Sequence, residues 1–134
     1  MSMAGSTTHL IVRPGWAALV AATLLAGCQG SGASRPYGVA TGGYARSGRD
    51  AILSRHCGAC HDIPGVVGAH GVIGPPLDSF SRRTFVAGLL PNTPPNLIRW
   101  LREPQRIDPL SAMPTLGLDE QEAKNVAAYL YSLK

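Results

Sequence analysis

Residues 57–61 read Cys57-Gly58-Ala59-Cys60-His61, and this stretch of two thiols and one imidazole governs the interpretation of the whole chain. The spacing suits covalent attachment of haem, because each thiol can add to one vinyl group while the adjacent imidazole lies under the iron. A bare Cys-x-x-Cys pair has two other common uses, as a redox dithiol and as half of a zinc site. The rest of the sequence has to separate these three uses.

Neither alternative use finds support elsewhere in the sequence. A redox dithiol of the thioredoxin type requires a βαβ context, and no alternating strand pattern is present. A four-ligand zinc site needs further Cys or His at suitable spacing, such as a second Cys-x-x-Cys, and the third cysteine is the isolated Cys28. The sequence therefore favours haem attachment through Cys57 and Cys60, with His61 as an axial iron ligand.

The second axial position on such an iron would be filled by Met113 or His70. Met113 lies in a loop, residues 104–118, that is rich in proline, and a proline follows it directly and stiffens the approach of the thioether. Methionine is commonly core filler, but this loop placement and the known pairing of His with Met on haem iron favour Met113 as the ligand. His70 lies in a Gly-rich loop and is expected at the surface, as is His56.

Helix start and stop signals predict an all-α domain. Residues 48–55 have helical spacing and lead into the thiol motif. Thr93 followed by two prolines is typical of a helix start, and Pro104 is expected to end that helix. Asp119 with Glu122 three residues later is typical of a capping box that opens a last helix.

Clusters of Gly and Pro mark the segments between these helices as connecting loops. A shorter helix is expected around residues 82–89, and no hairpin is expected. The two terminal helices are expected to cross, with Gly48 at their point of close approach. The fold class predicted is a small all-α domain wrapped around one covalently bound haem.

The N-terminal third does not have the sequence of a domain. Residues 11–26 are mostly apolar, but the unbroken apolar run is shorter than the about 20 residues that span a bilayer. Residues 1–27 are therefore predicted to be a signal peptide. Its end resembles the bacterial lipoprotein signal, which predicts lipidation of Cys28; the alternative is an ordinary secretory signal with an incidental cysteine. Residues 28–47 are rich in Gly and Ser, and a flexible tether is expected there.

Size and charge narrow the class of protein further. Residues 48–134, the predicted domain, are too few to bury a large core unaided, so haem is expected to supply its centre and the apo-protein to fold poorly. The formal net charge of +4 falls to +3 when Arg13 leaves with the signal, because eleven Lys and Arg then face eight Asp and Glu. This excess is too weak and scattered to predict a nucleic-acid partner.

Three motifs occur in one order, namely Cys57 to His61, Gly74-Pro75-Pro76-Leu77 and Met113-Pro114. With them, residues 48–134 resemble a class I cytochrome c. The resemblance implies that the Pro75 carbonyl orients the ring of the axial His61. It also implies a Trp and an Arg near the haem propionates, which points to Trp100 and to Arg82 or Arg83. The chain departs from the mitochondrial type in having just two lysines, Lys124 and Lys134, instead of a lysine-rich docking ring.

The resemblance implies a one-electron carrier with a single haem c, which is not itself an enzyme. Similar lipid-tethered bacterial domains lie on the periplasmic side of a membrane and pass electrons between a quinol-oxidising complex and a terminal oxidase, or act as subunits of dehydrogenases. Two other functions stay open. An open-site haem enzyme or gas sensor would need a distal acid-base group, and the sequence offers none. A structural lipoprotein that uses the dithiol predicts no haem.

Overall fold

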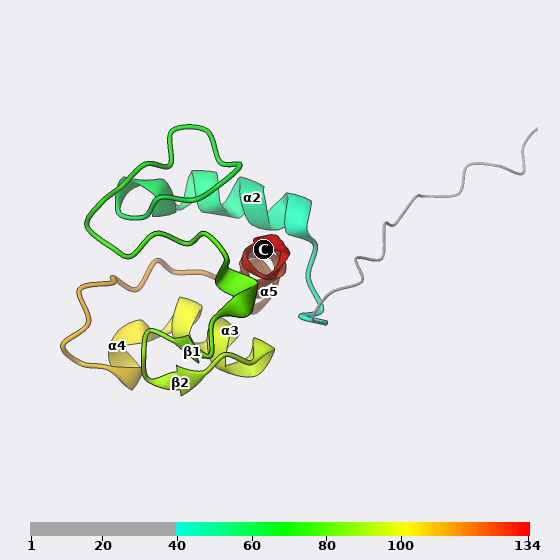
Figure 1. The fold of residues 1–134 in the computed structure, drawn as a ribbon. Coiled ribbons are helices and arrows are strands. Elements are labelled where there is room, and N and C mark those ends of the chain that lie inside the picture. Colours follow the sequence, from blue (N-terminus) through cyan, green and yellow to red (C-terminus); the bar gives the residue numbers. More distant parts are fainter. Residues whose placement is uncertain (1–39) are drawn as a thin grey trace, which may run out of the picture. The chain divides into compact units, whose positions relative to one another are not determined.

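The computed structural model describes residues 40–134 of the chain. The predicted signal peptide, Cys28 and most of the predicted tether lie outside these residues. The elements follow in the order α2 (Ala45–Ser54), η1 (Cys57–Ala59), η2 (Phe80–Arg82), β1 (Phe85–Val86), β2 (Leu90–Pro91), α3 (Pro94–Arg102), α4 (Pro104–Ile107) and α5 (Glu120–Ser132) (Figure 1). Within this described part, no helix has both the length and the apolar composition needed to cross a membrane.

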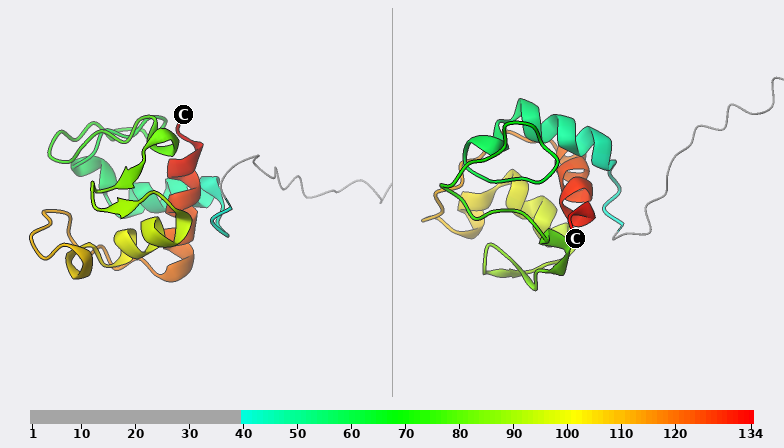
Figure 2. Two further views of the ribbon diagram at one scale, coloured as in Figure 1. Left: turned by 60° about the horizontal axis from the view of Figure 1, so that its bottom comes forward. Right: turned by 45° about the horizontal axis from the view of Figure 1, so that its top comes forward.

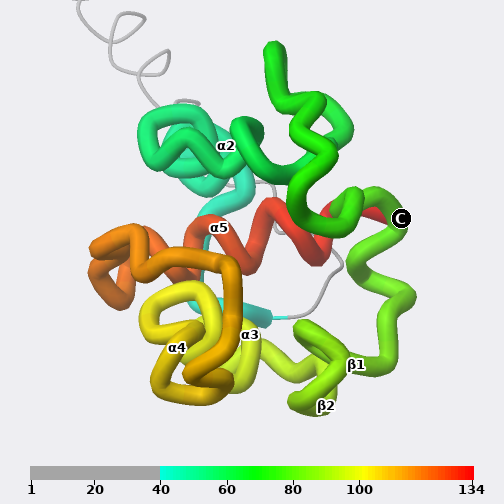
Figure 3. The backbone as a smooth tube through the Cα atoms, turned by 90° about the vertical axis from the view of Figure 1, so that its left-hand side faces the viewer, coloured from blue at the N-terminus to red at the C-terminus, as the bar shows by residue number. Residues whose placement is uncertain are grey.

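Helix α5 is the centre of the described domain. It contacts α2 on one side and α3 on the other. Figure 1 looks along α5, and Figure 3 shows it from the side, between α2 and the α3–α4 pair. Each helix contributes a fully buried aliphatic side chain, since Ile52, Leu97 and Val126 expose 1%, 1% and 2% of their surface. Burial of each such side chain contributes about 1.5–3 kcal/mol, so these three helices form the core.

The crossing of α2 and α5 depends on Gly48, as predicted. A Cβ atom at this position would lie 2.0 Å from the carbonyl oxygen of Asn125, so any larger residue would push the helices apart. The helix predicted at residues 48–55 begins earlier than expected, however, because α2 starts at Ala45. The reason is a distant contact: the Tyr44 amide donates a hydrogen bond of 2.9 Å to the Asn125 side chain, which fixes the segment before the helix.

The starts of α5 and α3 follow the sequence signals. The predicted capping box is confirmed, because the Asp119 carboxylate accepts from the Glu122 amide at 2.7 Å and the Glu122 carboxylate accepts from the Asp119 amide at 3.1 Å. Helix α3 begins at Pro94, directly after Thr93, although the Thr93 side chain makes no capping hydrogen bond. Pro104 does end this helical run, but it also opens the short helix α4, which the sequence did not predict.

The helix expected at residues 82–89 is wrong. The chain instead forms a small antiparallel hairpin, in which Phe85 pairs with Pro91 and Val86 with Leu90 (Figure 2). Ala87 and Gly88 at its tip have φ values of 52° and 73°, and two successive left-handed residues are what a tight hairpin turn requires. The fold class is a small, mostly helical domain, close to the all-α domain predicted, but with a hairpin where none was expected.

Candidate functional site

The two thiols lie on one short turn that follows α2. The chain leaves the helix through His56, whose φ of 55° is left-handed, and then enters η1. The His61 amide donates to the Cys57 carbonyl at 3.0 Å, which closes the turn. Cys57 and Cys60 are both free and half-buried, so the turn presents two available thiols beside one imidazole.

The imidazole of His61 is held in one orientation by the segment that follows. Its Nδ1 lies 2.7 Å from the Pro75 carbonyl oxygen, and because a carbonyl can only accept, Nδ1 is the protonated nitrogen. The backbone of Gly74 lies directly against the ring, where a Cβ atom would be 2.4 Å from Cε1. The free nitrogen is therefore Nε2, and the acceptor on the other side of the ring increases its basicity as a metal ligand.

The loop that carries Pro75 is braced against the thiol motif. The Gly74 amide donates to the Cys60 carbonyl at 2.8 Å, and the Leu77 amide donates to the Asp62 carbonyl at the same distance. Helix α5 supplies a third brace, since the Tyr129 hydroxyl donates to the Pro64 carbonyl at 2.6 Å. These contacts fix the position of the His61 ring through the backbone.

Met113 lies in the loop between α4 and α5, residues 108–118. Its side chain is half-buried and packs against the hydrophobic core. This loop and the loop after the thiol motif extend toward the same side of the domain (Figures 1 and 2). His70, the competing ligand, is on the surface: its side chain is 81% exposed and its Nδ1 lies 3.2 Å from the Asp62 carboxylate. His56 is exposed as well.

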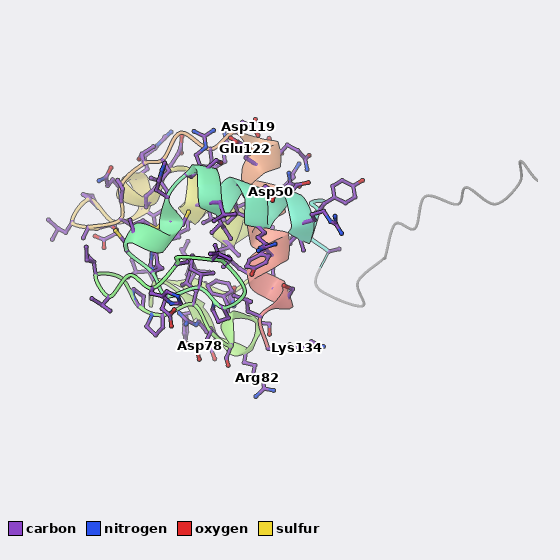
Figure 4. All side chains as sticks on the ribbon, turned by 90° about the horizontal axis from the view of Figure 1, so that it is seen from above. Asp50, Asp78, Arg82, Asp119, Glu122 and Lys134 are labelled. Atoms are coloured by element: carbon purple, nitrogen blue, oxygen red, sulfur yellow. The ribbon has the colours of Figure 1, made fainter. Side chains whose placement is uncertain are left out.

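The two candidate arginines differ in placement. Arg82 is exposed and points outward into solvent (Figure 4). Arg83 is half-buried, and its guanidinium donates to the Pro76 carbonyl and, at 3.2 Å, to the Asp78 carbonyl. Arg83 therefore adjoins the segment that holds the His61 ring. Trp100, on α3, is 8% exposed and belongs to the core.

The surroundings of the thiols do not suit the two alternative uses of the motif. Burial raises the pKa of the Cys57 thiol, the opposite of the lowered pKa of a reactive redox dithiol. Among residues 40–134, no three His, Cys, Asp or Glu side chains lie close enough to share a metal ion, so zinc lacks its ligands. The sheet in this region is a two-stranded antiparallel hairpin and not part of a βαβ unit.

Comparison with known families agrees with this geometry. The sequence matches the cytochrome c family over residues 45–134. The chain belongs to the cytochrome c family. Its cofactor is therefore haem c, covalently attached, and a cytochrome c domain indicates electron transfer through this haem.

Two relatives of this cytochrome c domain are cytochrome c oxidase subunits. The chain is 34% identical over 91 residues to a cytochrome c oxidase subunit 2 of Alkalihalophilus pseudofirmus, an alignment that covers 67% of the chain and 26% of the relative. It is 34% identical over 100 residues to the cytochrome c oxidase subunit 2 of Bacillus sp. strain PS3, covering 72% of the chain and 28% of the relative. The chain thus spans about a quarter of the length of these relatives. No solved structure gives a significant match.

The residues of this cytochrome c domain fit haem c. Two free thiols lie on one turn, the neighbouring imidazole has a free Nε2, and a half-buried thioether lies in a loop on the same side of the domain.

A cavity of about 510 Å³ lies elsewhere, between α3 and α5. It is lined by Ile98, Arg102 and Lys124 among others and contains none of these groups. Arg55 also contacts the loop of Met113, and no local sequence pattern pairs it with that loop.

Proposed function

We propose that this cytochrome c domain is a one-electron carrier, in which Cys57 and Cys60 hold the haem and His61 and Met113 bind its iron. When bound, the haem supplies an iron that changes between the ferrous and ferric states. The hydrogen bond from His61 Nδ1 to the Pro75 carbonyl carries most of the support, since it leaves Nε2 free for the iron beside two available thiols.

Ligation by Met113 separates a carrier from an enzyme. The Met113 thioether would favour the ferrous state and raise the potential, and by binding the iron it would leave no position for a substrate. The oxidised wild-type protein should show the weak long-wavelength iron–sulfur charge-transfer band and bind cyanide slowly. Rapid cyanide binding without the band would favour an open-site haem enzyme or sensor and would overturn the carrier function.

Arg83 and Trp100 are proposed to face the haem propionates. Arg83 and Arg82 are adjacent and carry the same charge, but only Arg83 is held against the segment that contacts His61. Removal of a cation near the iron favours the ferric state, so Arg83→Gln should lower the midpoint potential. Arg82→Gln is the matched control and should leave the potential unchanged in a redox titration. Equal shifts in both variants would contradict the role of Arg83.

The electron acceptor is proposed to be a terminal oxidase. Support comes from the relatives, which are cytochrome c oxidase subunits, and the alternative is that this chain is itself a haem-containing subunit of an oxidase or dehydrogenase complex. Purification from native membranes under mild conditions, with identification of the proteins that accompany it, distinguishes the two. A carrier purifies alone and its reduced form is oxidised by added oxidase, whereas a subunit remains with its complex.

The domain is proposed to be exported and held at the periplasmic side of a membrane by lipid on Cys28. Two acyl chains give stable anchoring, whereas one gives marginal binding. Cys28→Ser should therefore move nearly all of the cytochrome from the membrane fraction to the soluble fraction, with its absorption spectrum unchanged. A wild-type protein that is already soluble, or that begins downstream of Cys28, would rule out the anchor.

A further inference from the structure

The side chain of Arg55, which lies outside the motifs of the proposed ligands, contacts both helix α5 and the loop that carries Met113. Arg55, which directly follows α2, donates from Nη2 to both carboxylate oxygens of Glu122, at 2.8 and 2.7 Å. Its other terminal nitrogen, Nη1, donates to the carbonyl oxygen of Leu116 at 3.2 Å. The guanidinium thus reaches two acceptors more than sixty residues away in the sequence.

The two residues joined by the second hydrogen bond, Arg55 and Leu116, are close in sequence to residues proposed to hold the haem and its iron. Arg55 precedes Cys57 by two residues, and Leu116 follows Met113 by three. Among residues 40–134, the other hydrogen bonds of the loop 108–118 are local and go to acceptors between Pro104 and Ser111. Within the described part, the bond from Arg55 is therefore the one hydrogen bond that joins this loop to the end of α2, directly before the thiol motif.

Glu122 keeps the guanidinium in place for this contact. Its carboxylate belongs to the capping box of α5 and is fixed by the Asp119 amide. Figure 4 shows Asp119 and Glu122 beside one another at the start of this helix. A fork-shaped guanidinium that binds both carboxylate oxygens has a defined orientation, so its remaining nitrogen is aimed at the Leu116 carbonyl.

We propose that Arg55 is a positioning residue for Met113: it fastens the methionine loop to the segment that carries Cys57 and so holds the thioether at the iron. The inference rests on the proposed function, in which Met113 is the second axial ligand. Loops that bind ligands open more readily than core elements, so loss of a tie should increase the open population without unfolding the domain.

The test compares haem-loaded Arg55→Met with the wild type. Methionine keeps the alkyl stem and removes all donors. We expect the iron–sulfur charge-transfer band to weaken and cyanide to bind about tenfold faster, because a charge-assisted hydrogen bond is lost at a partly exposed site. Lys124→Gln is the matched control: Lys124 is 32% exposed against 33% for Arg55, and its 2.6 Å ion pair with Glu120 stays within α5.

The outcomes separate a positioning role from a purely structural one. A weaker band and faster cyanide binding in Arg55→Met, with Lys124→Gln unchanged, support the proposal. A folded Arg55→Met with the wild-type band and rate, or equal changes in both variants, would overturn it and leave Met113 ligation intact. Lack of the band in the wild type would remove both the ligation and the inference. If Arg55→Met does not fold, Glu122→Gln should raise the cyanide rate several-fold, and an unchanged rate there is evidence against the proposal.

Discussion

The segment 57–77 and the loop 108–118 are held in different ways. The first is fixed mainly by backbone hydrogen bonds, with Gly71 bonded to Gly58, Gly74 to Cys60 and Leu77 to Asp62 at 2.8–3.0 Å. The second is held by short-range bonds around Asp108 and Ser111 and by the side chain of Arg55. Changes in the first segment should therefore disrupt assembly of the domain, whereas changes in the second should disrupt iron ligation alone.

This difference suits the proposed ligation, in which the two axial ligands differ in strength. The imidazole side is part of the rigid scaffold, and its ring is confined by Gly74 and Pro75. The thioether side is a loop packed on the core through Leu118, which is 6% exposed, and through half-buried Leu116 and Met113. We therefore expect ligand exchange to begin on the methionine side.

The largest effect is expected from loss of both thiols. Cys57→Ala or Cys60→Ala should leave haem attached by one thioether, and the double variant should carry no covalent haem. Because the small domain depends on its cofactor for a core, the double variant should also lose most of its helical structure. Haem staining of a denaturing gel and far-ultraviolet circular dichroism measure the two effects. Denaturant-resistant haem in the double variant would disprove the attachment.

A smaller, local effect is expected from Met113→Ala. The fold and covalent haem should remain, the iron–sulfur band should disappear, and cyanide or carbon monoxide should bind rapidly. Met113→His should lower the midpoint potential, since axial ligands shift haem potentials over a range on the order of 0.8 V. His70→Ala is the control and should leave the band, ligand binding and potential unchanged. If Met113→Ala kept the wild-type spectrum while His70→Ala opened the iron to cyanide, the assignment of the ligands would have to be reversed.

A substitution at Gly74 tests the rigid side. In Gly74→Ala the new methyl group would meet the His61 ring at 2.4 Å, and such overpacking typically costs about 1–3 kcal/mol. The ring should shift, so the Soret spectrum and the potential should change together with stability. Gly48→Ala is the matched comparison, because it clashes with α5 at 2.0 Å but not with the ring. It should lower the denaturation midpoint and leave the spectrum as in the wild type. A changed spectrum in Gly48→Ala together with a wild-type spectrum in Gly74→Ala would contradict the role of Gly74 in confining the His61 ring.

The sequence predicted those features that depend on neighbouring residues. The capping box at Asp119 and the helix start at Pro94 are confirmed because each is set within one turn of chain. Glycine destabilises the interior of a helix, so its presence at residue 48 indicated a packing reason. The close approach of α5 at Gly48 confirms this prediction. The order of the motifs was enough to identify the fold class.

The features that the sequence missed are set by distant contacts or by uncommon turns. The start of α2 depends on Asn125, which is 81 residues from Tyr44, and the pairing of Arg55 with Glu122 spans 67 residues. The hairpin at residues 85–91 turns through a left-handed alanine, which is rare, and is stabilised by burial of Val86 against the core. No local pattern contains this information.

The smallest expected effect is an acid sensitivity of the ion pair between Arg55 and Glu122. The hydrogen bond from Arg55, followed by that from the Asp119 amide, lowers the pKa of Glu122 below its usual 4.5. A lowered carboxyl pKa contributes stability that is present above the usual value and is lost as the pH falls through the lowered one. The raised pKa of Arg55 changes nothing here, because its charge is complete throughout the acid range.

Denaturant midpoints of the haem-loaded wild type and Glu122→Gln between pH 6 and pH 3 measure this contribution. The wild-type midpoint should fall more steeply below about pH 4.5 than that of the variant, which has no carboxylate at this position to protonate. The difference should be modest, because the two side chains are 33% and 30% exposed and solvent screens the pair. Glu120→Gln removes the other carboxylate with a lowered pKa, so it serves as the control for a general charge effect. Parallel curves for the wild type and Glu122→Gln would contradict a stabilising contribution of the Arg55–Glu122 pair.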